Sequence, residues 1–142
     1  MVDSKYQNNS NVYGGMVMGC CSLKTEGKKR IVYTCSGCCD LGKTSDLLGR
    51  KLREEGMALS GCSCLAGIAA DIPDLIETAK TADEIICIDG CELSCATRVI
   101  EKINIHPKTY ILTEYGLKGG NFDVSEKIID ELYSKIFMEL KG

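Results

Sequence analysis

Most of the ten cysteines in this chain follow short apolar segments of the kind that form β-strands. The carboxyl ends of parallel strands meet at one edge of a sheet, which is where open α/β proteins build their sites. Cys35 and Cys38 follow the segment 31–34, Cys62 and Cys64 follow 57–60, and Cys91 and Cys95 follow 85–90. The cysteine positions therefore predict a parallel sheet whose carboxyl end gathers thiols.

Length and composition favour one globular domain in a reducing compartment. At 142 residues the chain can bury roughly two thirds of its unfolded surface, so it does not need disulfides to be stable. The first eleven residues are polar where an apolar signal segment would begin, and no apolar run is long enough to span a bilayer. We therefore expect a cytoplasmic protein with reduced thiols and no membrane partner. The net charge of −3 gives no reason to expect nucleic acid as a partner.

Strand-like and helix-like segments alternate along most of the chain. We expect residues 1–29 to form a partly flexible leader and residues 30–142 to form the domain. The predicted strands are 30–35, 57–60, 84–89 and 109–113. The first predicted helix covers 44–54, the second begins near Asp71 with Pro73 in its first turn, and the third begins at or just after Cys91. The fourth predicted helix follows Gly119 and Gly120 and opens with Asp123 and Glu126 as a capping box. This order predicts an α/β fold: a single three-layer domain with a four-stranded, mainly parallel sheet, flavodoxin- or Rossmann-like, with helices on both faces.

The segment after the third predicted strand has the most specific local chemistry. Cys91 and Cys95 are four residues apart, so on a helix they would lie on one face and could hold one metal ion. The positive end of a helix favours thiolates, and Gly90 would allow a sharp turn between strand and helix. By contrast, we interpret Cys87 as a core residue within the strand and Cys39 as a structural residue.

The number of cysteines bears on the choice between metal and redox chemistry. Cys35 and Cys38 have C-x-x-C spacing, which fits a zinc half-site and a redox pair equally well. A redox pair needs only two thiols, whereas tetrahedral zinc or an iron–sulfur cluster takes four. The surplus therefore favours metal. Cys20 and Cys21 in the leader are either a second group of soft ligands, suited to copper(I), or part of a mobile tail.

A phosphate-loop pattern competes with this interpretation. Residues 37–44 match G-x-x-x-x-G-K-[ST] between a strand and a helix, and Asp89 ends an apolar strand like a magnesium-binding aspartate. Two cysteines within the loop and the small predicted sheet argue against a nucleotide hydrolase. Asp89 could instead tune a metal through its ligands or cap the third helix. His106 precedes Pro107 and is interpreted as a turn residue.

With these residues identified, the chain resembles the DGC-domain family, which is named for a central Asp-Gly-Cys, here residues 89–91. The resemblance runs from about Tyr33 to Leu117, and the leader lies outside it. It implies a metal site made by four cysteines, carried over onto Cys35, Cys64, Cys91 and Cys95 with Cys38 as the alternate. It also implies that Lys43 and Thr44 match a phosphate loop by coincidence. The family brings no settled biochemical function with it.

The sequence therefore predicts a metal-binding protein with zinc as the cofactor, held by cysteine thiolates at the carboxyl ends of the strands. An iron–sulfur protein, or a thiol-based redox or sulfur-transfer protein, is the alternative. A phosphate-loop nucleotide-binding protein is the third hypothesis. The sequence leaves open whether the protein is an enzyme, and apart from the metal ion it names no partner.

Overall fold

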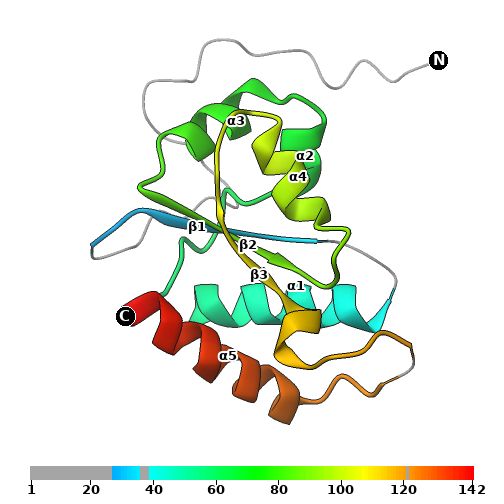
Figure 1. Cartoon of the computed structure of the whole chain (residues 1–142). Coiled ribbons are helices and arrows are strands. Elements are labelled where there is room, and N and C mark those ends of the chain that lie inside the picture. The colour runs from blue at the N-terminus through cyan, green and yellow to red at the C-terminus, as the bar shows by residue number, and fades with distance from the viewer. Residues whose placement is uncertain (1–26, 36–38, 121) are drawn as a thin grey trace, which may run out of the picture.

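The computed structural model describes residues 27–35, 39–120 and 122–142 of the chain, and it shows an α/β fold (Figure 1). In chain order the elements are β1 (Arg30–Thr34), α1 (Asp40–Glu54), α2 (Leu65–Ala69), α3 (Pro73–Lys80), β2 (Glu84–Asp89), α4 (Cys95–Glu101), β3 (Lys108–Ile111), the 3-10 helix η1 (Leu112–Tyr115) and α5 (Glu126–Lys141). The three strands form one parallel sheet in the order β1-β2-β3. No helix within the described ranges combines the length and the apolar content needed to cross a membrane.

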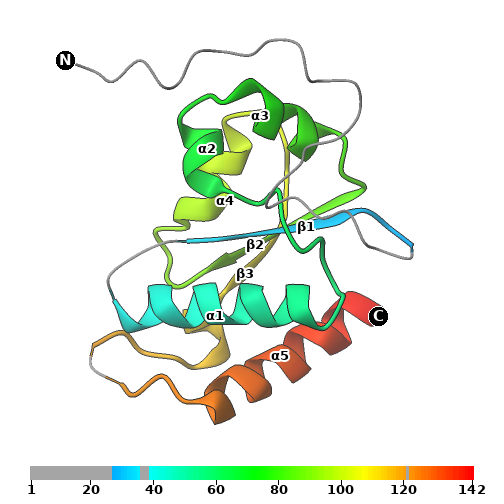
Figure 2. The same cartoon turned by 180° about the vertical axis from the view of Figure 1, so that it is seen from behind.

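Helices cover both faces of the sheet, as predicted (Figures 1 and 2). Side chains alternate between the faces along a strand, so neighbouring residues of β1 enter different cores. Val32 packs with residues of α1 and α5, such as Leu48 and Leu132. Ile31 and Tyr33 pack on the opposite face with residues of α2, α3 and α4. Strands β1 and β2 are thus buried on both sides, which explains why they are continuous apolar runs in the sequence, whereas only Tyr110 of β3 is buried.

The prediction of a strand over residues 57–60 is wrong, and the described residues contain three strands rather than four. The segment does run beside the outer edge of β1, where the Leu59 N–H donates to the carbonyl of Arg30 at 2.9 Å. The next outward-facing carbonyl, that of Val32, accepts instead from Nη2 of Arg53 at 3.2 Å. Because this guanidinium lies where a second backbone bond would form, the segment does not become a strand.

In the amino-terminal half, one helix starts earlier than predicted and one helix was not predicted. Helix α1 begins at Asp40, four residues before the predicted start at Thr44, because Cys39 acts as the N-cap and its Sγ accepts from the N–H of Gly42 at 3.4 Å. Helix α2 was not predicted, since five residues are too few to show a helical period. Helix α3 begins at Pro73 as expected, with no N–H lost from the helix.

The later elements are also shifted by local backbone conformation. Helix α4 begins at Cys95 rather than near Cys91, since Ser94 is in the left-handed conformation with φ 50°. The third strand ends at Ile111, and Leu112 begins η1. At the start of α5 the N-cap is Ser125, whose hydroxyl accepts from the N–H of Ile128, and not Asp123. The apolar face of α5 is as predicted, with Ile129, Leu132 and Ile136 buried.

Candidate functional site

The candidate site lies at the carboxyl end of the sheet, where β1 and β2 lead into the loops that carry cysteines. Cys35 follows β1 directly, and Asp89 ends β2 before Gly90 and Cys91. Cys95 opens α4 on the same side of the sheet. This end of the molecule is also where α1 begins (Figure 1).

Cys35 is bound to the loop that follows β2. Its Sγ accepts a hydrogen bond from the N–H of Gly90 at 3.1 Å, and the side chain is half-buried. Burial raises the pKa of the Cys35 thiol, while hydrogen bonds from Ser45 and Gly90 lower it and the charges of Asp89 and Cys95 raise it further. The segment after β1 therefore meets the segment after β2 at Cys35. The charge of Cys95 contributes to the raised pKa of the Cys35 thiol.

Gly90 allows this meeting by its small size rather than by an unusual backbone angle. A Cβ atom at Gly90 would lie 2.9 Å from the carbonyl carbon, the carbonyl oxygen and the Cβ of Leu41. Backbone atoms cannot move aside as a flexible side chain can, so only glycine lets the loop after β2 pack on the first turn of α1.

Asp89 caps α4. Its Oδ1 accepts from the N–H of Ala96 at 2.7 Å, and its Oδ2 accepts from the N–H and the hydroxyl of Thr97 at 3.1 and 2.7 Å. The carboxylate is fully buried, and these three bonds satisfy it. Of the two roles considered for Asp89, the structure confirms the cap, and this cap fixes where Cys95 lies relative to β2.

Cys91 and Cys95 do not share a helix face, contrary to the prediction. Cys91 is half-exposed and lies in a turn that the N–H of Ser94 closes by donating to the carbonyl of Cys91 at 3.0 Å. Cys95, the first residue of α4, is exposed. Because Cys91 lies in this turn and not in α4, helical spacing does not determine how the two thiols lie relative to each other.

Cys64 approaches from the opposite side of the same end of the molecule. It is exposed, and it is the N-cap residue of α2, a helix that packs against α4. Burial raises the pKa of the Tyr33 hydroxyl, and the charges of Cys87 and Cys64 raise it further, which places Cys64 near the end of β1. Cys38, Cys20 and Cys21 lie outside the described residues.

The other cysteines have different environments. Cys87 is fully buried in the core between the sheet and α2 to α4, as predicted, and burial strongly raises the pKa of its thiol. Cys39 is exposed and serves α1 as its N-cap, which agrees with a structural role. Cys62 is buried and is disulfide-bonded, contrary to the expectation that the thiols are reduced, so it does not count among the free thiols.

Among residues 27–35, 39–120 and 122–142, no three Cys, His, Asp or Glu side chains lie close enough together to hold a metal ion. The free thiols in the strand-end loops are the donors that zinc and iron–sulfur clusters prefer. The donor chemistry therefore fits such a group. The described residues join Cys35 to the loop that carries Cys91 but do not complete a set of ligands.

Comparison with known proteins identifies the family. The model of the DGC domain matches residues 31–136, which is most of the chain and contains the Asp-Gly-Cys at residues 89–91. The chain belongs to the DGC-domain family. The "anaerobic and virulence modulator AnvM" of Pseudomonas aeruginosa is 34% identical over 89 residues, which cover 62% of this chain and 66% of AnvM. No solved structure matches this DGC protein.

Residues 40–44 of the phosphate-loop pattern lie in α1, and residues 37 and 38 lie outside the described residues. Lys43 and Thr44 lie inside α1, and the Thr44 hydroxyl is buried and donates to the carbonyl of Asp40 at 2.7 Å. The carboxylate of Asp89 is occupied by its bonds to α4. The two side chains that would hold magnesium are thus used within the fold. His106 is exposed just before β3, in agreement with its interpretation as a turn residue.

Two residues of the DGC domain have roles that the sequence did not reveal. Ser45 was considered only as a helix cap, but it is fully buried and its hydroxyl donates to the carbonyl of Ile88 at 2.6 Å, beside Cys35. Arg53 was given no role by the sequence, yet its guanidinium binds the edge of β1. A serine on the apolar side of a predicted helix was the available signal for Ser45, whereas no signal pointed to Arg53.

Proposed function

We propose that this DGC-domain protein binds zinc through cysteine thiolates at the carboxyl end of its sheet. The proposed ligands are Cys35, Cys64, Cys91 and Cys95, with Cys38 as the alternate. The observation that carries the proposal is the contact of Cys35 with the loop after β2: its Sγ accepts from Gly90, beside Cys91, and the charge of Cys95 acts on it. This contact joins the loops after β1 and β2 at the edge of the sheet where ligands bind in this class of fold.

The described residues would help a metal in definite ways. When bound, zinc would supply a positive charge that holds its ligands as thiolates and joins the loops into one unit. The Gly90 N–H would stabilise the thiolate of Cys35, since a hydrogen bond to the charged form favours that form. Zinc–sulfur bonds are about 2.3 Å long, so the four sulfur atoms must lie closer together in the zinc-bound protein than they do in this structure.

Two further features belong to the same proposal. The parallel strands, the helices on both faces and a site at the carboxyl end support a flavodoxin- or Rossmann-like relationship. The free thiols support a cytoplasmic location, where thiols stay reduced.

A second candidate is a thiol-based redox protein or an iron–sulfur protein. The specific observation in its favour is the exposure of Cys64 and Cys95, because accessible thiols can exchange with other thiols and disulfides. The name of the relative describes a modulator of anaerobic behaviour and virulence, and redox sensing by thiols would suit such a role in this chain.

The first test is to purify the protein without oxygen and without added metal, and to measure metal, acid-labile sulfide and the absorption spectrum. We expect zinc near one per chain with no visible absorption. Iron with acid-labile sulfide and a brown colour would instead indicate that the site holds an iron–sulfur cluster. Protein without metal that also fails to take up added zinc would contradict the proposal.

Single substitutions then assign the ligands. Cys64→Ser and Cys91→Ser are each expected to lower the zinc content sharply, because a tetrahedral site loses a thiolate in each variant. Cys87→Ser tests a buried cysteine of the core and Cys39→Ser tests an exposed helix cap; both should keep the zinc. Full zinc retention in the first two variants would refute the ligand assignment.

A further inference from the structure

A cavity of about 420 Å³ lies beside the outer edge of β1. It is bounded by the carboxyl-terminal half of α1, by Thr34 at the end of β1 and by the segment 60–66. Leu65, Ala66 and Leu75 give one side of the cavity an apolar wall. The proposed zinc function does not explain this cavity, although Cys64 also lines it.

Arg53 brings a positive charge to the wall of the cavity, and none of the described carboxylates forms an ion pair with it. The side chain is half-buried, and one nitrogen, Nη2, donates to the carbonyl of Val32 at 3.2 Å. Its Nε is buried and has no hydrogen-bond partner. Within the described part of the chain, no carboxylate lies within ion-pair distance of the guanidinium. A buried polar group without a partner is costly, so it marks a place where a ligand is expected.

The backbone of α1 makes room at Gly49 for the methyl group of Thr34, beside this guanidinium. A Cβ atom at Gly49 would clash with that methyl group, whereas it would lie in ordinary contact, at 3.8 Å, with both terminal nitrogens of Arg53. Thr34, at the end of β1, therefore packs directly on the helix next to the arginine. Burial lowers the pKa of Arg53, which agrees with a charge held away from water.

The other charged groups around the cavity leave an excess of one positive charge. Arg50 and Asp46 both line it, and their ion pair of 2.9 Å neutralises them. Glu54 faces a neighbouring recess of about 250 Å³ and makes no ion pair with Arg53. A single guanidinium in a partly apolar cavity suits one planar carboxylate, which pairs with two parallel N–H groups.

We propose that this cavity binds a small organic acid, with its carboxylate at Arg53 and its hydrocarbon part against Leu65 and Leu75. The apolar wall favours an organic anion over inorganic phosphate, because phosphate offers no surface to bury there. This inference is independent of the zinc proposal, since it rests on Arg53 and the cavity and needs no metal.

The test is an NMR titration of the full chain with butyrate, observing the backbone amides and the Nε–H of Arg53. Butyramide serves as the uncharged match of butyrate, and inorganic phosphate serves as the anion without a hydrocarbon part. We expect saturable shifts at Arg53, Ser63 and Leu65 with butyrate at about millimolar affinity, as befits so small a ligand. Butyramide and phosphate should bind at least about tenfold more weakly.

Two variants locate the site and one controls for charge. Arg53→Met should weaken butyrate binding by about tenfold or more, and Ala66→Phe should block the cavity from its exposed rim without touching Arg53. Arg98→Met removes an exposed arginine of α4 that does not line the cavity, and it should bind like the wild type. The zinc content should stay unchanged in Arg53→Met. Equal binding of butyrate and butyramide, preferential binding of phosphate, or undiminished binding in both Arg53→Met and Ala66→Phe would overturn the proposal.

Discussion

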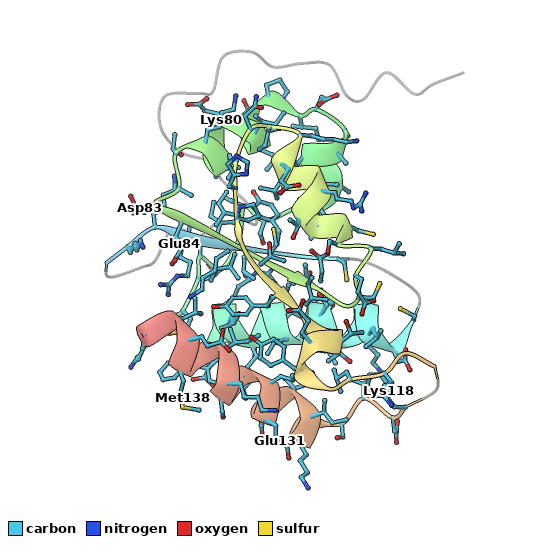
Figure 3. The ribbon with its side chains drawn as sticks, viewed as in Figure 1. Lys80, Asp83, Glu84, Lys118, Glu131 and Met138 are labelled. Carbon is cyan, nitrogen blue, oxygen red and sulfur yellow. The ribbon has the colours of Figure 1, made fainter. Side chains whose placement is uncertain are left out.

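The two ends of the sheet differ in how their polar groups are satisfied. At the amino end, Arg30 pairs with Glu84 across the β1–β2 register, and Asp83 accepts from the N–H of Lys29 (Figure 3). At the carboxyl end, Cys35 is held by one N–H and the other thiols there are free. The charged groups described at the amino end are thus paired with each other. The carboxyl end instead carries thiols that are not disulfide-bonded and could bind a metal. A zinc site at the carboxyl end, as proposed above, would account for this difference.

The largest effect is expected from Gly90→Ala, which attacks the packing of the carboxyl end. The added Cβ would meet the backbone of Leu41 at 2.9 Å, so the loop after β2 must move away from α1. We expect a loss of about 3 kcal/mol in the free energy of unfolding, as for severe overpacking, together with a loss of zinc. Urea denaturation measures the first and metal analysis the second. A variant as stable as the wild type would show that the two segments are not in contact.

Zinc should distinguish the thiols of the carboxyl end from one another. At zinc concentrations about 100-fold above the dissociation constant, alkylation of Cys64 and Cys95 should slow by about 100-fold, because the free fraction falls in proportion. Cys39 is exposed at the same end but is not a proposed ligand, so its rate should stay unchanged. Mass spectrometry of alkylated peptides measures each rate. Equal protection of Cys39 would place it in the site and would require a new set of ligands.

Asp89→Asn tests the buried cap that positions α4. The substitution leaves an amide where three donors converge, so we expect a cost of about 2 kcal/mol in the free energy of unfolding. Thr97→Val, which removes the hydroxyl bonds to Asp89 and to Thr109 and keeps the two N–H bonds to the carboxylate, should cost about half as much. Thermal and urea unfolding provide the comparison. If Asp89→Asn costs no more than Thr97→Val, the carboxylate does not carry the cap.

The smallest effect is expected at the amino end, from Glu84→Gln. The ion pair with Arg30 is partly buried, with side-chain exposures of 15% and 22%, so we expect a loss of about 1 kcal/mol. The loss should shrink in high salt, since exposed charges such as Lys28 contribute to it. Zinc content should not change. A change in zinc binding would show that the two ends are coupled.

The sequence predicted the parts of the fold that depend on apolar pattern. Strands β1 and β2 were found because their buried runs are continuous, and the inward face of α5 was found because its period is helical. The strand over residues 57–60 was wrong because the side chain of Arg53, which lies in α1 just before the segment, takes the Val32 carbonyl that the strand would have used. A contact of this kind has no signature in the segment itself.

For the candidate site, the sequence predicted the location but not the local geometry. Cys35 does contact the loop after β2 at the carboxyl end of the sheet, where the strand pattern placed it. The start of α4 was misplaced because the left-handed conformation of Ser94 ends the turn after Cys91, and serine gives no warning of this conformation. The distances between thiols depend on such loop conformations, and a spacing of residues cannot supply them.

The most direct test of the thiolate site is X-ray absorption at the zinc edge of the full-length protein loaded with one zinc per chain. Four sulfur ligands at about 2.3 Å are the expected result, with Cys91→Ser reducing the sulfur count. A shell of nitrogen and oxygen ligands at about 2.0 to 2.2 Å would contradict a thiolate site at the carboxyl end of the sheet.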